Sequence, residues 1–133
     1  MAKYVYPAIF TPEENGAYSV NFPDLKGCYT CGDDLQDAIT MAEDVLAFYL
    51  YDAETENRKV AAPSKASTIQ LGKDDFVNYI ACDTLEYAKM HSNKAVKKTL
   101  TIPEWLNEAA TRAGINFSQA LQETLMKQVG NER

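Results

Sequence analysis

Three cysteines and one histidine are the residues of this chain best suited to bind a metal or exchange electrons. Cys28 and Cys31 form a C-x-x-C pair, which could bind zinc or form a redox-active disulfide. However, residues three apart in an extended segment point to opposite faces, the sequence has no second pair, and His91 is the only histidine. We therefore predict that the chain binds no metal, and that Cys28 and Cys82 are small core residues.

Carboxylates near the ends of predicted strands could converge on Mg²⁺ and activate water. Four aspartates have this position: Asp24, Asp33, Asp34 and Asp83. Asp24 suits a turn and the Asp33-Asp34 pair suits a helix cap, and the first predicted strand contains no carboxylate. We therefore predict that the chain is not an enzyme and has no catalytic residue and no cofactor.

The elements that would position these residues follow from hydrophobic periodicity. Four segments have the composition or alternation of strands: residues 3–10, 17–22, 28–31 and 76–82. Asp33 or Asp34 caps a helix whose apolar residues recur at three and four positions from Leu35 to Leu50. A polar loop is expected from Ala53 to Lys65, and residues 84–95 show no sustained period and begin a linker. The order predicts a β-β-β-α-β front domain.

The predicted helix carries more apolar residues than one sheet face requires. Met41, Val45 and Phe48 form a second line beside the main stripe. This line could contact a partner or form the rim of the core.

The C-terminal part has a different pattern. Residues 96–102 alternate, with Lys97, Thr99 and Thr101 on the polar face. Pro103 then begins a helix that ends at Gly114, and Asn116 caps a second helix with its partner at Gln119. Three residues line one face of that second helix: Leu121, Leu125 and Val129.

This strand and its two helices are too small to bury a core alone, since units of fewer than about 40 residues rarely fold without help. A second copy would pair the strands across a two-fold axis and close four helices over the apolar face. The polar face of such a ribbon can enter the major groove of DNA. A dimerisation module with a solvated polar face is the alternative.

The pattern of strand, Pro103, helix, Gly114, Asn116 and helix resembles the ribbon-helix-helix fold of Arc- and MetJ-type repressors. The resemblance implies that Lys97, Thr99 and Thr101 read bases. It also implies that the free N–H groups at the start of the second helix, around Phe117 and Ser118, bind a phosphate.

Charge is divided unevenly within the net −6. Residues 1–92 hold 15 acidic and 7 basic side chains, whereas residues 93–133 hold 4 and 6. An acidic front part suits a basic partner and a mildly positive tail suits DNA, although acidic surface can also serve solubility alone. Because no apolar run approaches the ~18 residues of a membrane span, we expect a cytoplasmic protein without membrane contact.

Several short motifs occur in one order: Tyr6-Pro7-Ala8, residues 16–20, 22–25 and 27–30, and Gly32 before an acidic helix. They resemble the HicB family of antitoxins, and the segment KAVKKTLTIPEWLNEAATRAGINFSQ is similar to family members that end in a ribbon-helix-helix domain. The resemblance implies an α+β chain with three parts. Residues 1–83 would form a partial ribonuclease H-like domain without an active site, residues 84–94 a linker, and residues 95–133 a DNA-binding and dimerisation domain.

The resemblance also implies a function. Such a protein would bind and neutralise a HicA-type mRNA-cleaving toxin and repress its own operon as a type II antitoxin. The expected toxin contacts are Tyr18, Asp24, Leu25, Asp37 and Asp44. The chain would be a homodimer through its C-terminal domain, which the front domains could double to a tetramer. The alternative is a stand-alone ribbon-helix-helix repressor whose front domain senses a small molecule in a pocket.

Overall fold

The computed structural model describes residues 1–92 and 94–131 of the chain. Residue 93 of the predicted linker and residues 132–133 of the predicted C-terminal domain lie outside the described residues. The chain forms two compact units, Met1–Lys94 and Ala95–Arg133. A four-stranded antiparallel sheet and four α-helices make up its regular structure in the described ranges, which confirms the predicted α+β class.

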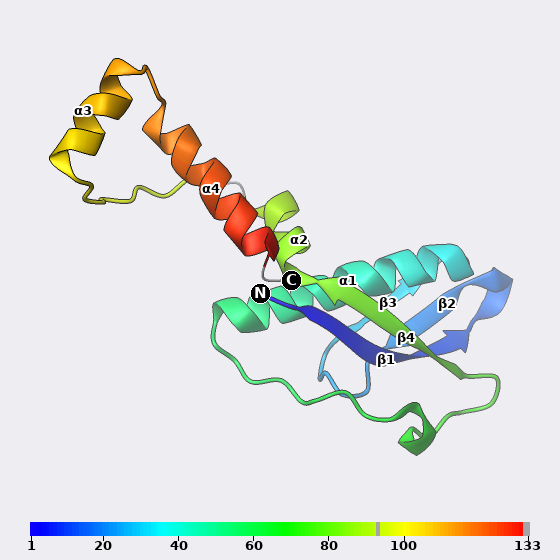
Figure 1. The fold of residues 1–133 in the computed structure, drawn as a ribbon. Helices are drawn as coiled ribbons and strands as arrows, with labels where there is room; N and C mark the ends of the chain where they lie inside the picture. The colour runs from blue at the N-terminus through cyan, green and yellow to red at the C-terminus, as the bar shows by residue number, and fades with distance from the viewer. Residues whose placement is uncertain (93, 132–133) are drawn as a thin grey trace. The chain divides into compact units, whose positions relative to one another are not determined.

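The sheet lies in the first unit and has the strand order β3-β2-β1-β4. Its strands are β1 (Lys3–Pro12), β2 (Tyr18–Asn21), β3 (Tyr29–Gly32) and β4 (Phe76–Asp83). Every neighbouring pair is antiparallel, and β4 pairs with β1 from Lys3↔Asp83 to Phe10↔Phe76 (Figure 1). The four strands predicted for the front domain are therefore confirmed. In the predicted alternation of residues 17–22, Val20 and Phe22 are buried and Asn21 is exposed.

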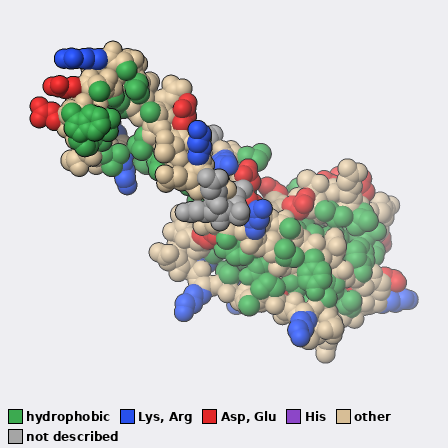
Figure 2. All heavy atoms as spheres, in the orientation of Figure 1, with side chains coloured by type: hydrophobic (Ala, Val, Ile, Leu, Met, Phe, Trp, Pro, Cys, Tyr) green, Lys and Arg blue, Asp and Glu red, His purple; other side chains and the backbone are tan. Residues whose placement is uncertain are grey.

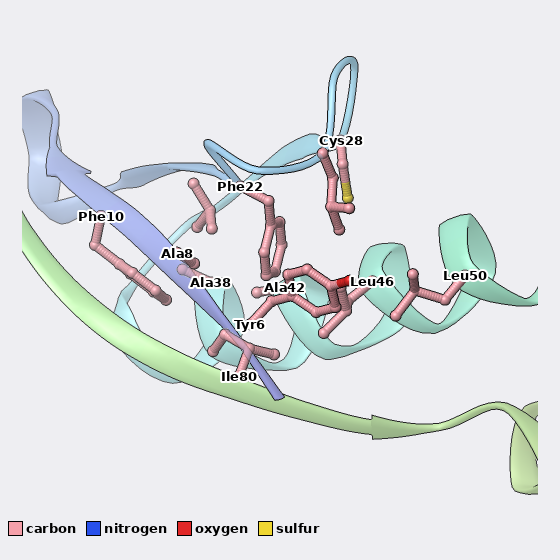
Figure 3. Packing of buried hydrophobic residues seen from close by; sticks show 12 residues of the cluster. Tyr6, Ala8, Phe10, Phe22, Cys28, Ala38, Ala42, Leu46, Leu50 and Ile80 are labelled. Carbon is pink, nitrogen blue, oxygen red and sulfur yellow. The ribbon is translucent and has the colours of Figure 1, made fainter. Parts of the chain in front are cut away.

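Helix α1 (Leu35–Thr55) lies against one face of this sheet (Figure 1). Asp34 is its N-cap, because its carboxylate accepts a hydrogen bond from the N–H of Asp37 at 2.8 Å. Side chains of the sheet and the helix meet in one apolar core, in which Phe22, Cys28 and Leu46 point toward one another (Figure 3). Phe10 is fully buried and stacks on Phe76 with 5.3 Å between ring centroids.

Helix α2 (Thr84–His91) occupies residues for which the sequence predicts a linker. The prediction of a linker is wrong for these residues. The helix is short and buries only Thr84 and Ala88, so its sequence shows no long apolar period. Asp83 caps it by accepting from the N–H of Leu85 at 3.0 Å, and the buried Thr84 accepts a hydrogen bond from the N–H of Ala2 at 2.9 Å. Only one side of the helix packs, through residues such as Ala88.

A long connection joins α1 to β4 and includes the short 3₁₀ turn η2 (Ala66–Thr68); a similar turn, η1 (Glu14–Gly16), joins β1 to β2. The predicted loop begins later than Ala53, because α1 continues to Thr55. The Tyr6 hydroxyl donates to the carbonyl of Ala61 at 2.6 Å. This hydrogen bond holds the connection against the sheet.

The second unit contains α3 (Glu104–Arg112) and α4 (Phe117–Asn131). Gly114 has the predicted left-handed conformation, with φ +71°, and the N–H of Ile115 donates to the carbonyl of Ala110 at 3.1 Å. Asn116 caps α4 by accepting from the N–H of Gln119 at 3.1 Å, as predicted. The Gln119 side chain instead donates to Glu123, so the predicted box is half formed.

Residues 95–103 form no hydrogen-bonded strand in the single chain, and the described side chains of the second unit are exposed apart from the partly buried Ala110. Pro103 lies at the N-cap of α3, one position before the predicted one. The second unit therefore has no buried core of its own within the described residues.

Candidate functional site

The aspartates that could have formed a metal site have local structural roles. Asp24 accepts hydrogen bonds from both the N–H, at 2.9 Å, and the hydroxyl of Ser64, and thereby holds the long connection. Asp34 and Asp83 cap α1 and α2, and Asp33 uses its backbone N–H to bind Asp37 at 2.8 Å. Within the described ranges, no group of three or more His, Cys, Asp or Glu side chains could hold a metal ion.

The two cysteines of the C-x-x-C pair face different surroundings. Cys28 is fully buried, with its Sγ 4.0 Å from the carbonyl of Val45, whereas Cys31 is exposed. Burial raises the pKa of the Cys28 thiol to about 11. Burial, followed by the charges of Asp83 and Glu54, raises the pKa of Cys82 to about 12. Both thiols are therefore protonated near neutral pH, and Cys28 is confirmed as a core residue.

Because the pKa of the Cys28 thiol is raised, we expect the folded protein to lose stability at alkaline pH. The folded chain binds the Cys28 proton more tightly than the unfolded chain does. The contribution of this proton to stability is therefore fully present below pH 9 and is lost as pH rises toward 11. For Cys28, we expect the free energy of unfolding in urea to fall by about 2 kcal/mol between about pH 8 and pH 10.5. Cys28→Ala, although less stable at about pH 8, should show a smaller fall; an equal fall in both proteins would contradict this origin.

The outer face of α1 carries exposed apolar and acidic side chains. Met41 is 41% and Phe48 54% exposed, whereas Val45 packs against the core. The helix contains five carboxylates and no Lys or Arg. Asp37 and Asp44, two of the predicted toxin contacts, are exposed on this helix.

Aromatic residues of α2 extend this face, and the sequence reasoning missed them because it predicted a linker there. The Tyr87 ring lies 6.4 Å from that of Phe48 and 5.5 Å from that of Tyr51. His91 stacks on Tyr87 at 4.0 Å. Burial, and then the nearby Asp44 carboxylate, raise the pKa of Tyr87.

The other three predicted toxin contacts have structural roles. Leu25 is only 1% exposed, so its prediction as a contact is wrong; its side chain packs in the core. Asp24 is engaged by Ser64, and Tyr18 is half-buried with its ring edge against Phe76 at a centroid distance of 6.1 Å. The turn composition around Asp24 and Leu25 could not show that these side chains point inward.

The sheet face opposite α1 exposes several large apolar side chains. Val5 and Tyr79 on β1 and β4 are 51% and 52% exposed, and Figure 2 shows hydrophobic side chains gathered on the first unit over these strands. Tyr29 on β3 is 68% exposed. Beside it lies an open depression of about 510 Å³, lined by Thr11, Ser19, Val20, Asn21, Tyr29, Thr30 and Cys31.

The second unit contains a groove of about 480 Å³ between residues 98–102 and the two helices. Leu100 and Ile102 of the predicted apolar face line it, as do the polar residues Lys98 and Asn107, whereas Thr99 and Thr101 do not. Phe117 and Ser118, predicted near a phosphate, line the same groove. Its large apolar side chains are all exposed in the single chain: Leu100, Ile102, Leu106, Ile115, Phe117 and Leu121.

Across the described part of the chain, every helix is too short or too polar to span a bilayer.

Comparison with known proteins connects these surfaces to a family. Residues 6–125 match the family described as "HicB_like antitoxin of bacterial toxin-antitoxin system". A segment of 60 residues is 38% identical to Antitoxin HicB 1 of Photorhabdus laumondii subsp. laumondii; it covers 44% of this chain but only 39% of that relative.

Two solved structures share the fold. A chain of the "Toxin-Antitoxin complex from Streptococcus pneumoniae" is 26% identical with a TM-score of 0.61, over 95% of this chain and 99% of that one. The antitoxin HicB of Burkholderia pseudomallei is 13% identical with a TM-score of 0.53 over both full chains. Since the family match covers most of both units, this chain belongs to the HicB-like antitoxin family of bacterial toxin–antitoxin systems.

Proposed function

We propose that this chain is a type II antitoxin that neutralises a HicA-type mRNA-cleaving toxin with its first unit and represses its own operon with its second. The observation that carries the proposal is the family match over residues 6–125, which includes parts of both units. The similar Streptococcus pneumoniae chain comes from a toxin–antitoxin complex, which supports a protein toxin as the partner.

The charge of the first unit supports binding to a basic toxin. Residues 1–92 carry 15 acidic and 7 basic side chains, which would steer a cationic protein toward them. Under this proposal the first unit is a partial ribonuclease H-like sheet that binds the toxin without catalysing a reaction. Three aspartates near its strand ends are already engaged in local structure, because Asp34 and Asp83 cap helices and Asp24 binds Ser64.

The exposed apolar groove of the second unit supports a ribbon-helix-helix dimer. Leu100 and Ile102 would lie in the dimer core, because two copies of residues 96–102 can pair antiparallel and supply each other's missing strand. The opposite face would present Lys97, Thr99 and Thr101 to the major groove. The start of α4 at Phe117 would bind phosphate.

Co-expression tests the proposal as a whole. The full-length chain would be expressed with the small basic protein encoded beside it, and cell growth and co-purification would be measured. We expect the toxin alone to stop growth, the pair to restore it, and the two proteins to co-purify. Normal growth with the neighbouring protein alone, or failure to co-purify, would overturn the antitoxin function.

Operator binding tests the base-reading residues. Lys97→Ala and Thr99→Ala should each weaken operator binding by about 1–3 kcal/mol, the range for a good base contact, without changing the melting temperature. Ser118→Ala should instead weaken binding to operator and unrelated DNA alike, since phosphate contacts carry no sequence information. Fluorescence anisotropy with labelled duplexes at fixed salt would measure both. Unchanged operator affinity in Lys97→Ala and Thr99→Ala would remove them from the reading face.

A stand-alone repressor with a ligand-sensing first unit is the second candidate. The open depression of about 510 Å³ on the sheet face is the observation that favours it. It predicts that operator affinity responds to a small molecule without any partner protein, and that no small basic protein is encoded beside the chain.

A further inference from the structure

We propose that the basic toxin docks on the outer face of α1, at a surface formed by Met41, Asp44 and Phe48 of α1 and Tyr87 of α2, hereafter the α1 stripe. This inference rests on the proposed function, because the occupant is the basic toxin. It assigns the contact to one side of the first unit and leaves the sheet face opposite α1 free.

The geometry of α1 separates this stripe from the core. Residues 41, 44 and 48 recur at intervals of three and four and therefore share one face of the helix. Ala38, Ala42 and Leu46, on the opposite face, are fully buried against the sheet. The core is thus complete without Met41 and Phe48, which leave large apolar surface in water. Exposed aromatic and Met side chains are typical anchors of protein interfaces.

The charges on α1 favour a cationic occupant. Three of its carboxylates are engaged: Asp37 accepts from the N–H of Asp33 at 2.8 Å, Asp52 pairs with Arg58 at 3.3 Å, and Glu54 accepts from the Tyr4 hydroxyl at 2.7 Å. Asp44 forms no ion pair or hydrogen bond within the described ranges, and it lies near the Tyr87 ring. A carboxylate beside aromatic rings suits a Lys or Arg side chain, through a salt bridge and contact with the ring face.

The same charges disfavour a second copy of this chain at the stripe. Self-association there would bring two helices with five carboxylates each, and no Lys or Arg, face to face. Like-charge contacts of this kind suppress wrong partners. On the sheet face around Val5, Tyr29 and Tyr79, Lys3 pairs across from Asp83, so charges of both signs occur and this like-charge repulsion is absent. This face is therefore the main rival surface.

Calorimetry at low and high salt would test the α1 stripe. It would measure how tightly purified full-length variants bind the small basic protein encoded beside the chain, once the wild-type chain has been shown to bind it. Phe48→Ala and Asp44→Lys should each weaken binding at least tenfold, and Asp44→Asn should reduce the salt dependence. Two matched controls should stay within about threefold of wild type. Glu14→Lys makes the same charge change on the η1 turn, and Tyr29→Ala truncates an exposed aromatic on the rival face.

The outcomes separate the two proposals. If the wild-type chain binds the toxin but Phe48→Ala and Asp44→Lys bind equally well, the stripe is overturned and the antitoxin function stands. If Tyr29→Ala alone loses binding, the toxin docks on the sheet face. If the wild-type chain does not bind, both proposals fail. Because Phe48 and Asp44 are exposed, the melting temperatures of their variants should match the wild type.

Discussion

Gly32→Ala should destabilise the first unit by about 3 kcal/mol, the upper end for a methyl group forced into a packed core. Gly32 ends β3 where the start of α1 crosses it. A Cβ at this position would lie 2.3 Å from the backbone nitrogen and 2.5 Å from the Cα of Ala38. Backbone cannot rotate away as a flexible side chain can, so the strand or the helix must move and open the core.

Urea unfolding of the full-length protein, followed by tyrosine fluorescence, would measure this loss. Gly72→Ala is the matched control, because the Cβ there would meet only the Asp75 side chain, 3.0 Å away, which can shift. It should change the free energy of unfolding by less than about 1 kcal/mol. A Gly32→Ala protein as stable as Gly72→Ala would show that β3 and α1 do not approach each other this closely.

Local patterns predicted most elements of the fold. The alternation of residues 17–22, the aspartate cap of α1 and the Gly114-Asn116 turn each depend on residues close in sequence, and the structure contains all three. The acidic side of α1 was equally predictable. Asp44 carries its charge at a position that the helical period places outside the core.

Contacts between distant residues could not be predicted in this way. Helix α2 is fixed by Thr84, which bonds to Ala2 at the other end of the first unit. Asp24 is held by Ser64, and Leu25 is drawn into the core although it lies in a turn. Such contacts leave no periodic signal, so the docking role of Tyr87 could only be inferred once α2 was seen to pack beside Phe48.

The two units bury their apolar surface in different ways, which explains why the sequence predicted the first more completely. The first unit closes its own core around Phe10, Phe22 and Leu46. The second leaves its groove residues exposed, so its pattern of Leu100 and Ile102 has meaning only with a partner. A change in the groove should therefore affect assembly more than the fold of either helix.

Leu121→Asp should abolish the proposed dimer and reduce operator affinity more than 100-fold. Leu121 lines the groove and is 37% exposed in the single chain, so dimerisation would bury it. An unpaired carboxylate there would cost about 3 kcal/mol or more, and the two-fold axis would place it in both copies. Operator binding would fall with the dimer, because one chain cannot supply the paired ribbon.

Sedimentation velocity at micromolar concentration and operator anisotropy would measure both effects. Met126→Asp is the matched control: it introduces the same charge on α4 at a side chain that is 68% exposed and outside the groove. It should remain a dimer with nearly wild-type affinity. Toxin binding by Leu121→Asp should persist, because the α1 stripe lies within the first unit. If Leu121→Asp remains dimeric, the chains associate through a surface other than the groove, and the ribbon-helix-helix assignment loses its physical basis.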